Sequence, residues 1–193
     1  LIGCIYIIAF GALAYMRRQG LPLRFALEGL AVTAVGEGLL LLAVPVPPLL
    51  FLLVLYLATM RVRLLVDVGN WFLGRGQHER ALGAYSLALR LAPDAVDRRI
   101  ALINRGATQL RMQAPEAARA TLEEALAGEE VRLGARYLAA GYYNLGVACL
   151  RTNREAEAIR LFNLVLDILP NSIYSKAAQE ALKRLRADWP DRS

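Results

Sequence analysis

Pairs of small residues recur along the second half of this chain with one fixed spacing. In each pair a glycine precedes an alanine by twelve positions: Gly69 and Ala81, Gly106 and Ala118, Gly146 and Ala158. Two helices joined by a short turn approach closely only where the side chains at their contact are small. One such hairpin cannot bury its apolar face alone, so about three must stack to be stable. The spacing therefore predicts a row of helical hairpins.

The residues around each pair support the same prediction. The stretch Asp67 to Asp94 has a tight turn at Gly74-Arg75-Gly76. In each unit the second helix continues with a bulky and then a small residue, which are Tyr85 and Ala88, Leu122 and Ala125, Phe162 and Val165. A proline closes the first and third units, at Pro93 and Pro170. The second lacks it, and Pro115 instead stands where it can begin a helix.

This pattern resembles the tetratricopeptide repeat (TPR), with repeats at about 62–94, 99–127 and 136–170. The family period is about 34 residues, whereas these units recur after 37 and 40. The extra residues fall at 94–98 and 128–138, and the second insertion is expected to lengthen the first helix of the third repeat. The fold predicted is all-α: an α-solenoid of three hairpins, closed by a capping helix at 172–188.

The capping helix follows Asn171 or Ser172, either of which can cap its first turn. Its predicted apolar stripe is Ile173, Ala177, Ala178, Ala181, Leu182 and Leu185.

The resemblance implies a groove for a protein partner along the first helices of the repeats. Its expected lining is Asn70, Leu73, Ile103, Asn104, Ala107, Leu110, Tyr143, Asn144 and Val147. A known TPR class clamps a C-terminal carboxylate, but Val66, Ala140 and Asn144 replace its three basic residues. The mainly apolar lining favours a helix or an extended apolar segment. Alternatively, these residues pack on the chain's own linker or third apolar run.

Hydrophobic residues make up 56% of the chain, and its mean hydropathy is +0.37. Most of this apolar excess lies in the first 60 residues. We expect a transmembrane anchor at 1–63, with about three spans at 1–16, 25–44 and 47–62, and the repeat domain at 64–193. A second possibility is that the last two apolar runs form a hairpin that does not fully cross.

Positive charge predicts the orientation of this anchor. Arginines gather at 17–24 and again at Arg61 and Arg63, whereas the turn Pro45–Pro48 carries no charge. The positive-inside rule then places the N-terminus outside and the TPR domain in the cytoplasm, at an inner membrane. Only two of the 23 basic residues are lysine, which suggests a GC-rich bacterial genome.

A set of small and polar residues marks the second apolar run as a helix-packing surface. Its members are Gly29, Thr33, Gly36, Glu37 and Gly38. A carboxylate near the middle of a span is costly and usually faces protein or a cavity. The surface predicts contact with another membrane subunit, since a proton relay would need a second deep ionisable group.

Nothing in the sequence predicts catalysis, a metal or a cofactor. Cys4 and Cys149 share no motif spacing, His78 is the single histidine, and no phosphate-binding glycine loop is present. The net charge of +6 comes from arginines that alternate with acidic residues, which does not favour nucleic acid.

The sequence therefore predicts a non-enzymatic, membrane-anchored TPR scaffold or adaptor that binds other proteins at the cytoplasmic face. The alternative is an accessory or assembly subunit of a multi-subunit membrane complex, bound through its transmembrane helices.

Overall fold

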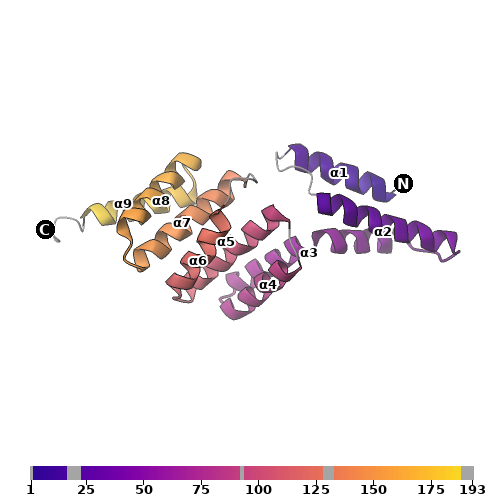
Figure 1. Cartoon of the computed structure of the whole chain (residues 1–193), viewed down its shortest axis with the longest axis horizontal. Coiled ribbons are helices and arrows are strands. Elements are labelled where there is room, and N and C mark those ends of the chain that lie inside the picture. The colour runs from indigo at the N-terminus through magenta and orange to yellow at the C-terminus, as the bar shows by residue number, and fades with distance from the viewer. Residues whose placement is uncertain (1, 17–22, 92–93, 128–132, 188–193) are drawn as a thin grey trace. The chain divides into compact units, whose positions relative to one another are not determined.

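Helices account for all the regular structure that the computed structural model describes, which covers residues 2–16, 23–91, 94–127 and 133–187. They are α1 (Ile2–Met16), α2 (Leu23–Leu41), α3 (Pro48–Gly74), α4 (His78–Arg90), α5 (Ala95–Arg111), α6 (Pro115–Leu126), α7 (Ala135–Arg151), α8 (Glu155–Ile168) and α9 (Ile173–Ala187) (Figure 1). Within these residues the all-α prediction is confirmed. The chain divides into unit 1, residues 1–65, and unit 2, residues 66–193.

Unit 1 consists of α1, α2 and the first part of α3. The helices α1 and α2 are antiparallel, because Gly3 lies against Thr33 and Ile7 lies against Gly29. A Cβ added to Gly3 would lie 2.1 Å from Oγ1 of Thr33, so a larger residue could not be accommodated without a shift. The rings of Tyr6, Phe10 and Phe25 pack together with centroids 4.7 to 5.9 Å apart.

The expectation of about three spanning helices is wrong for the described residues. By length and composition, α3 is the one described helix that is long and apolar enough to cross a membrane. The helix α1 has 15 residues, fewer than the roughly 20 that a span needs. The helix α2 has 19 residues but includes three charged side chains, Arg24, Glu28 and Glu37.

In unit 2 the same turn follows the first helix of each hairpin. A residue with positive φ stands seven positions after each repeat glycine: Gly76 (φ 74°), Gln113 (φ 58°) and Asn153 (φ 60°). Each turn has the same two backbone bonds, as at Gln113, where the Gln113 N–H donates to the Leu110 carbonyl (3.2 Å) and the Ala114 N–H to the Gln109 carbonyl (3.0 Å). This is the Schellman C-cap, which satisfies carbonyls that the helix end leaves free. The predicted turn at Gly74-Arg75-Gly76 is confirmed.

The repeat positions form the core of unit 2. All nine predicted second-helix residues have no exposed surface: Ala81, Tyr85, Ala88, Ala118, Leu122, Ala125, Ala158, Phe162 and Val165. The bulky member lies over the glycine of its own hairpin, and a Cβ on Gly69, Gly106 or Gly146 would come within 2.3 to 2.6 Å of it. The glycine is needed because a ring or a branched side chain, rather than another small residue, lies opposite it.

The ends of the helices refine the predicted boundaries. The helix α5 begins at Ala95 and is capped by Asp94, which accepts the Asp97 N–H at 2.8 Å. Ser172 caps α9 by accepting the Ser175 N–H at 3.0 Å. On α9 the placement of Ile173 in the apolar stripe is wrong, because this residue is 71% exposed and the buried face instead follows Ser175, Ala178 and Leu182.

Some predicted features lie outside the described residues. These are most of the basic loop at 17–24, the closing Pro93 and the first part of the second insertion, 128–132.

Candidate functional site

The groove predicted along the first helices is partly core and partly surface. Ile103 and Leu110 are buried, with 2% and 5% of their surface exposed. Asn70 is exposed on α3. The other predicted lining residues are half-buried: Leu73, Asn104, Ala107, Tyr143, Asn144 and Val147. The surface open to a partner is therefore narrower and more polar than the sequence predicts, with an asparagine on each of α3, α5 and α7.

Asn70 is held in place from inside its own hairpin. The hydroxyl of Tyr85 donates to Oδ1 of Asn70 at 2.8 Å, and the rest of the Tyr85 side chain fills the space over Gly69. Burial raises the pKa of the Tyr85 hydroxyl, so it stays protonated and remains a donor. This bond positions the Asn70 amide on the surface of α3.

At the other end of the groove, Tyr143 lies among aromatic rings of the chain itself. Its ring centroid is 5.9 Å from that of Phe162 and 6.1 Å from that of Tyr174 on α9. Tyr174 also packs against the cluster that contains Ile103. The capping helix α9 therefore covers this part of the groove. The sequence signal was an aromatic residue in the first turn of α9, adjacent to Ile173.

Two arginines bind carbonyl groups near the ends of other helices, one within the second hairpin and one between the second and third hairpins. Arg99 on α5 donates its Nε–H to the Ala125 carbonyl at the end of α6 (2.7 Å). Arg151 at the end of α7 donates from Nη1 to the Leu110 carbonyl near the end of α5 (2.7 Å). Carbonyls at a helix C-terminus lack intrahelical donors, so cations are favoured there. These arginines thus serve helix capping between neighbouring helices.

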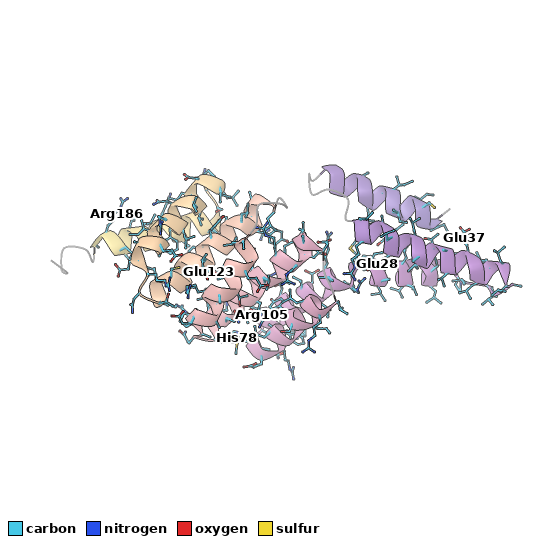
Figure 2. The ribbon with its side chains drawn as sticks, viewed as in Figure 1. Glu28, Glu37, His78, Arg105, Glu123 and Arg186 are labelled. Carbon is cyan, nitrogen blue, oxygen red and sulfur yellow. The ribbon has the colours of Figure 1, made fainter. Side chains whose placement is uncertain are left out.

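Cys149 and His78 lie on different helices of unit 2, α7 and α4. Cys149 is fully buried, and burial raises the pKa of its thiol to about 11. His78 and Glu79 lie at the start of α4, while Arg105 lies on α5 and Glu123 on α6 (Figure 2). Among the described residues, no three His, Cys, Asp or Glu side chains gather where they could hold a metal ion.

The predicted packing surface of α2 is used largely within unit 1. Gly29 contacts Ile7 of α1, Thr33 contacts Gly3 of α1, and Gly36 contacts Phe51 of α3. By contrast, a Cβ on Gly38 would meet nothing within 4 Å, and the side chain of Glu37 is exposed on the same helix (Figure 2). Binding of another membrane subunit by this surface stays a prediction.

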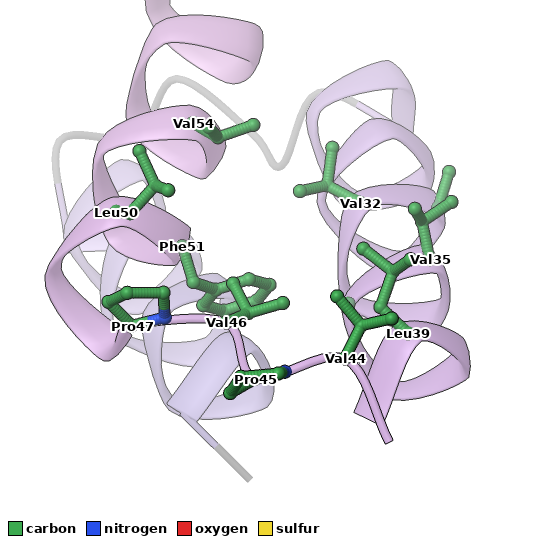
Figure 3. A pocket seen from close by; sticks show the side chains of 12 residues that line it. Val32, Val35, Leu39, Val44, Pro45, Val46, Pro47, Leu50, Phe51 and Val54 are labelled. Atoms are coloured by element: carbon green, nitrogen blue, oxygen red, sulfur yellow. The ribbon is translucent and has the colours of Figure 1, made fainter. Parts of the chain in front are cut away.

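An apolar groove lies between α2 and α3 where the two helices join (Figure 3). It has a volume of about 530 Å³. Val32, Val35 and Leu39 line it from α2, and Leu50, Phe51 and Val54 line it from α3, with the turn Val44–Pro47 at its end. No charged side chain lines it. The proline turn was predicted from the sequence, but the groove was not. The groove depends on how far α2 and α3 lie apart beside the turn.

Comparison with protein families supports the assignment of unit 2. The tetratricopeptide repeat family model matches residues 97–171, which span α5 to α8 and thus the second and third hairpins. The match supports a TPR protein, a family of generally non-catalytic interaction modules. Comparison with curated proteins gives no match.

Proposed function

We propose that this protein is a membrane-anchored TPR scaffold or adaptor, with unit 1 in the membrane and unit 2 binding another protein at the cytoplasmic face. The observation that carries the proposal is the set of three equivalent hairpins in unit 2, two of which lie in the family match. Repeats of this kind act by presenting an extended surface to a partner.

The anchor is supported by the exposed apolar surface of unit 1. Residues on the outside of α2 and α3 include Leu27, Leu30, Val35, Leu53 and Leu57, which are between 47% and 64% exposed. Large contiguous apolar patches are rarely exposed on soluble proteins, whereas lipid would cover such side chains. Arg61 and Arg63 lie at the end of the anchor nearest unit 2 in the chain, and Arg24 is joined to Arg61 through Glu28. This gathering of positive charge favours the cytoplasm for the repeats.

The proposed binding surface is the polar line of asparagines on the first helices of the repeats. Asparagine presents both a donor pair and an acceptor and so can pair with the backbone of an extended segment. The half-buried Ala107 and Val147 lie on the same helices and provide apolar contact. We propose that the partner is a peptide segment or helix of another protein.

Photo-cross-linking in intact membranes tests this proposal. The cross-linking amino acid p-benzoylphenylalanine replaces Asn70 in one variant and Gly83 in the control. Both positions are exposed in the first hairpin, but Gly83 is on its second helix, where an added Cβ meets open space. We expect discrete cross-linked proteins from position 70 and none from position 83. Equal cross-linking from both positions, or none from position 70, would contradict the proposed surface.

The same membranes test the accessory-subunit alternative. After mild detergent extraction, integral membrane proteins that purify with the chain in a fixed ratio, independently of any substitution at Asn70, would favour it.

A further inference from the structure

We propose that the α2–α3 hairpin enters the bilayer tip first and turns back within the hydrocarbon without crossing it. The inference rests on the proposed membrane anchoring and specifies how the anchor is inserted. The partner that covers the exposed apolar surface of the hairpin is therefore lipid, namely the acyl chains of one leaflet and of the middle of the bilayer.

Charged side chains define the level at which the hairpin leaves the membrane. Glu28 on α2 accepts from Nε of Arg24 at 2.6 Å and from Arg61 on α3, whose Nη1 and Nη2 lie 2.5 and 2.7 Å from its two oxygens. We call Arg24, Glu28 and Arg61 the charged collar. Because the charged collar joins α2 to α3, the charged side chains of both helices must lie at the same depth in the membrane. Arginines at this position can extend to the headgroups.

The two arms beyond the charged collar are too short for a bilayer. Leu41, at the end of α2, lies thirteen positions after Glu28, and Pro48, at the start of α3, lies thirteen positions before Arg61. At 1.5 Å per residue, each arm is about 20 Å long. The hydrocarbon core is about 30 Å thick. With the collar at one surface, the two helical arms end about 10 Å short of the other, and only the turn 42–47 lies beyond them.

The alternative placement moves the collar inward. If the tip reached the far headgroups, all three collar charges would lie about 10 Å inside the hydrocarbon, where ionised side chains are strongly disfavoured. Length and apolar composition would let α3 alone cross. The ion pair between Arg61 of α3 and Glu28 of α2 limits how deeply the hairpin can enter the membrane.

The composition of the tip fits hydrocarbon rather than water. No side chain from residue 39 to residue 50 is polar. Leu41, Leu42 and Leu49 are 89%, 75% and 82% exposed, so the tip does not bury itself against the rest of unit 1. A turn that emerged into water at the far surface would leave these leucines hydrated.

The backbone of the turn is also adapted to an apolar surrounding, where an N–H without an acceptor is costly. Pro45, Pro47 and Pro48 have no N–H. The N–H groups at 42, 43 and 44 donate within the turn, to the carbonyls at 38, 40 and 39, over 2.9 to 3.1 Å. In the described stretch 42–50, the donors without a backbone bond are those of Val46 and of Leu49 and Leu50 in the first turn of α3.

The apolar groove of Figure 3 completes the fit, since it opens beside this turn and could receive an acyl chain. Glu37 is the acidic side chain beyond the collar, nine residues past Glu28, and it interacts with another group of the protein. It is therefore not an isolated charge at that depth.

Spin-label depth measurements on the full chain in lipid vesicles test the proposal. Labels are attached to single cysteines in a Cys4→Ser background, where the buried Cys149 does not react with the label. The tip variants are Leu41→Cys and, as a second position in case one fails to insert, Leu49→Cys. The matched control is Leu23→Cys, which is 73% exposed at the collar end of α2. A membrane-impermeant maleimide is applied to each face in parallel.

We expect tip labels to collide more with oxygen than with a water-soluble nickel chelate, and the Leu23 label to show the reverse. Maleimide should label the tip variants at less than one-tenth of the Leu23→Cys extent from either face. Labelling of the tip from the face opposite unit 2 would overturn the proposal while leaving membrane anchoring intact. Spin–spin broadening at the tip that disappears on dilution with lipid would also overturn the proposal, because it would show that a second copy of the chain, rather than lipid, covers the tip. A chain that does not float with the vesicles would contradict both proposals.

Discussion

A substitution of Gly146 by alanine measures how closely the helices of the third hairpin approach. The added Cβ would lie 2.6 Å from Cε1 and 3.0 Å from Cδ1 of Phe162, whose side chain has no exposed surface and therefore little room to move. Overpacking of this kind costs about 1–3 kcal/mol. Alanine in a helix interior is favoured over glycine by about 0.5–1 kcal/mol. Gly146→Ala should therefore lower the free energy of unfolding, by about 1 kcal/mol at the middle of these ranges and by up to about 2.5 kcal/mol.

Gly83→Ala is the matched control within the same unit. Gly83 lies inside α4, and a Cβ there meets nothing within 4 Å. Only the helix preference remains, so this variant should be more stable by about 0.5–1 kcal/mol. The two substitutions are chemically identical, and they should differ in sign because of packing alone.

The assay is hydrogen exchange of backbone amides in the full chain in detergent micelles, which reports the free energy of opening of α7 and α8 for Gly146→Ala and of α4 for Gly83→Ala. A double-mutant cycle identifies the cause. In a Phe162→Ala background the ring is gone, so Gly146→Ala should no longer destabilise. An equal cost in both backgrounds would refute close packing against Phe162, as would a stabilising effect in the wild-type background.

Further substitutions test other parts of the repeat unit. Gln113→Gly should stabilise the second hairpin by about 0.5–1 kcal/mol in urea unfolding, because glycine adopts positive φ without the cost that glutamine incurs; an unchanged midpoint would contradict the strained turn. Asp94→Ala should destabilise α5 by about 1 kcal/mol through loss of its cap, and Asp94→Asn should retain most of the stability; hydrogen exchange in the first turn of α5 distinguishes them. Because burial raises the pKa of the Cys149 thiol to about 11, the neutral thiol favours the fold. That contribution is complete below about pH 8.5, the ordinary thiol pKa, and is lost as the pH rises towards 11. Unfolding titrations at pH 8 and 10 should therefore show a smaller loss for Cys149→Ala than for wild type; an equal loss would count against the raised pKa.

The repeat core could be predicted from the sequence because it depends on side-chain size at fixed spacing. A glycine followed after twelve positions by alanine identified each hairpin, and all nine second-helix residues of the pattern are buried. Gly141 was missed because it lies outside the pattern. A Cβ there would come 2.9 Å from Leu126 of the preceding hairpin, so it serves contact between repeats rather than within one.

The surface of the groove was harder to predict, since exposure depends on what packs from elsewhere in the chain. The register placed Ile103 and Tyr143 on the first helices, but Tyr174 on α9, thirty-one positions after Tyr143, covers that part. In unit 1, apolar composition indicated the helices. It could not show that Glu28 and Arg61, thirty-three positions apart, are paired, and this contact sets the length of each arm.

The most direct test of the account is the behaviour of the full chain reconstituted in lipid vesicles and washed with alkaline carbonate. We expect the chain to float with the lipid after the wash. Protease added on the side of unit 2 should then remove the repeats and leave a protected fragment from residues 1–65. Release of the intact chain by carbonate, or protease resistance of the repeats on the side where Arg63 is accessible, would contradict it.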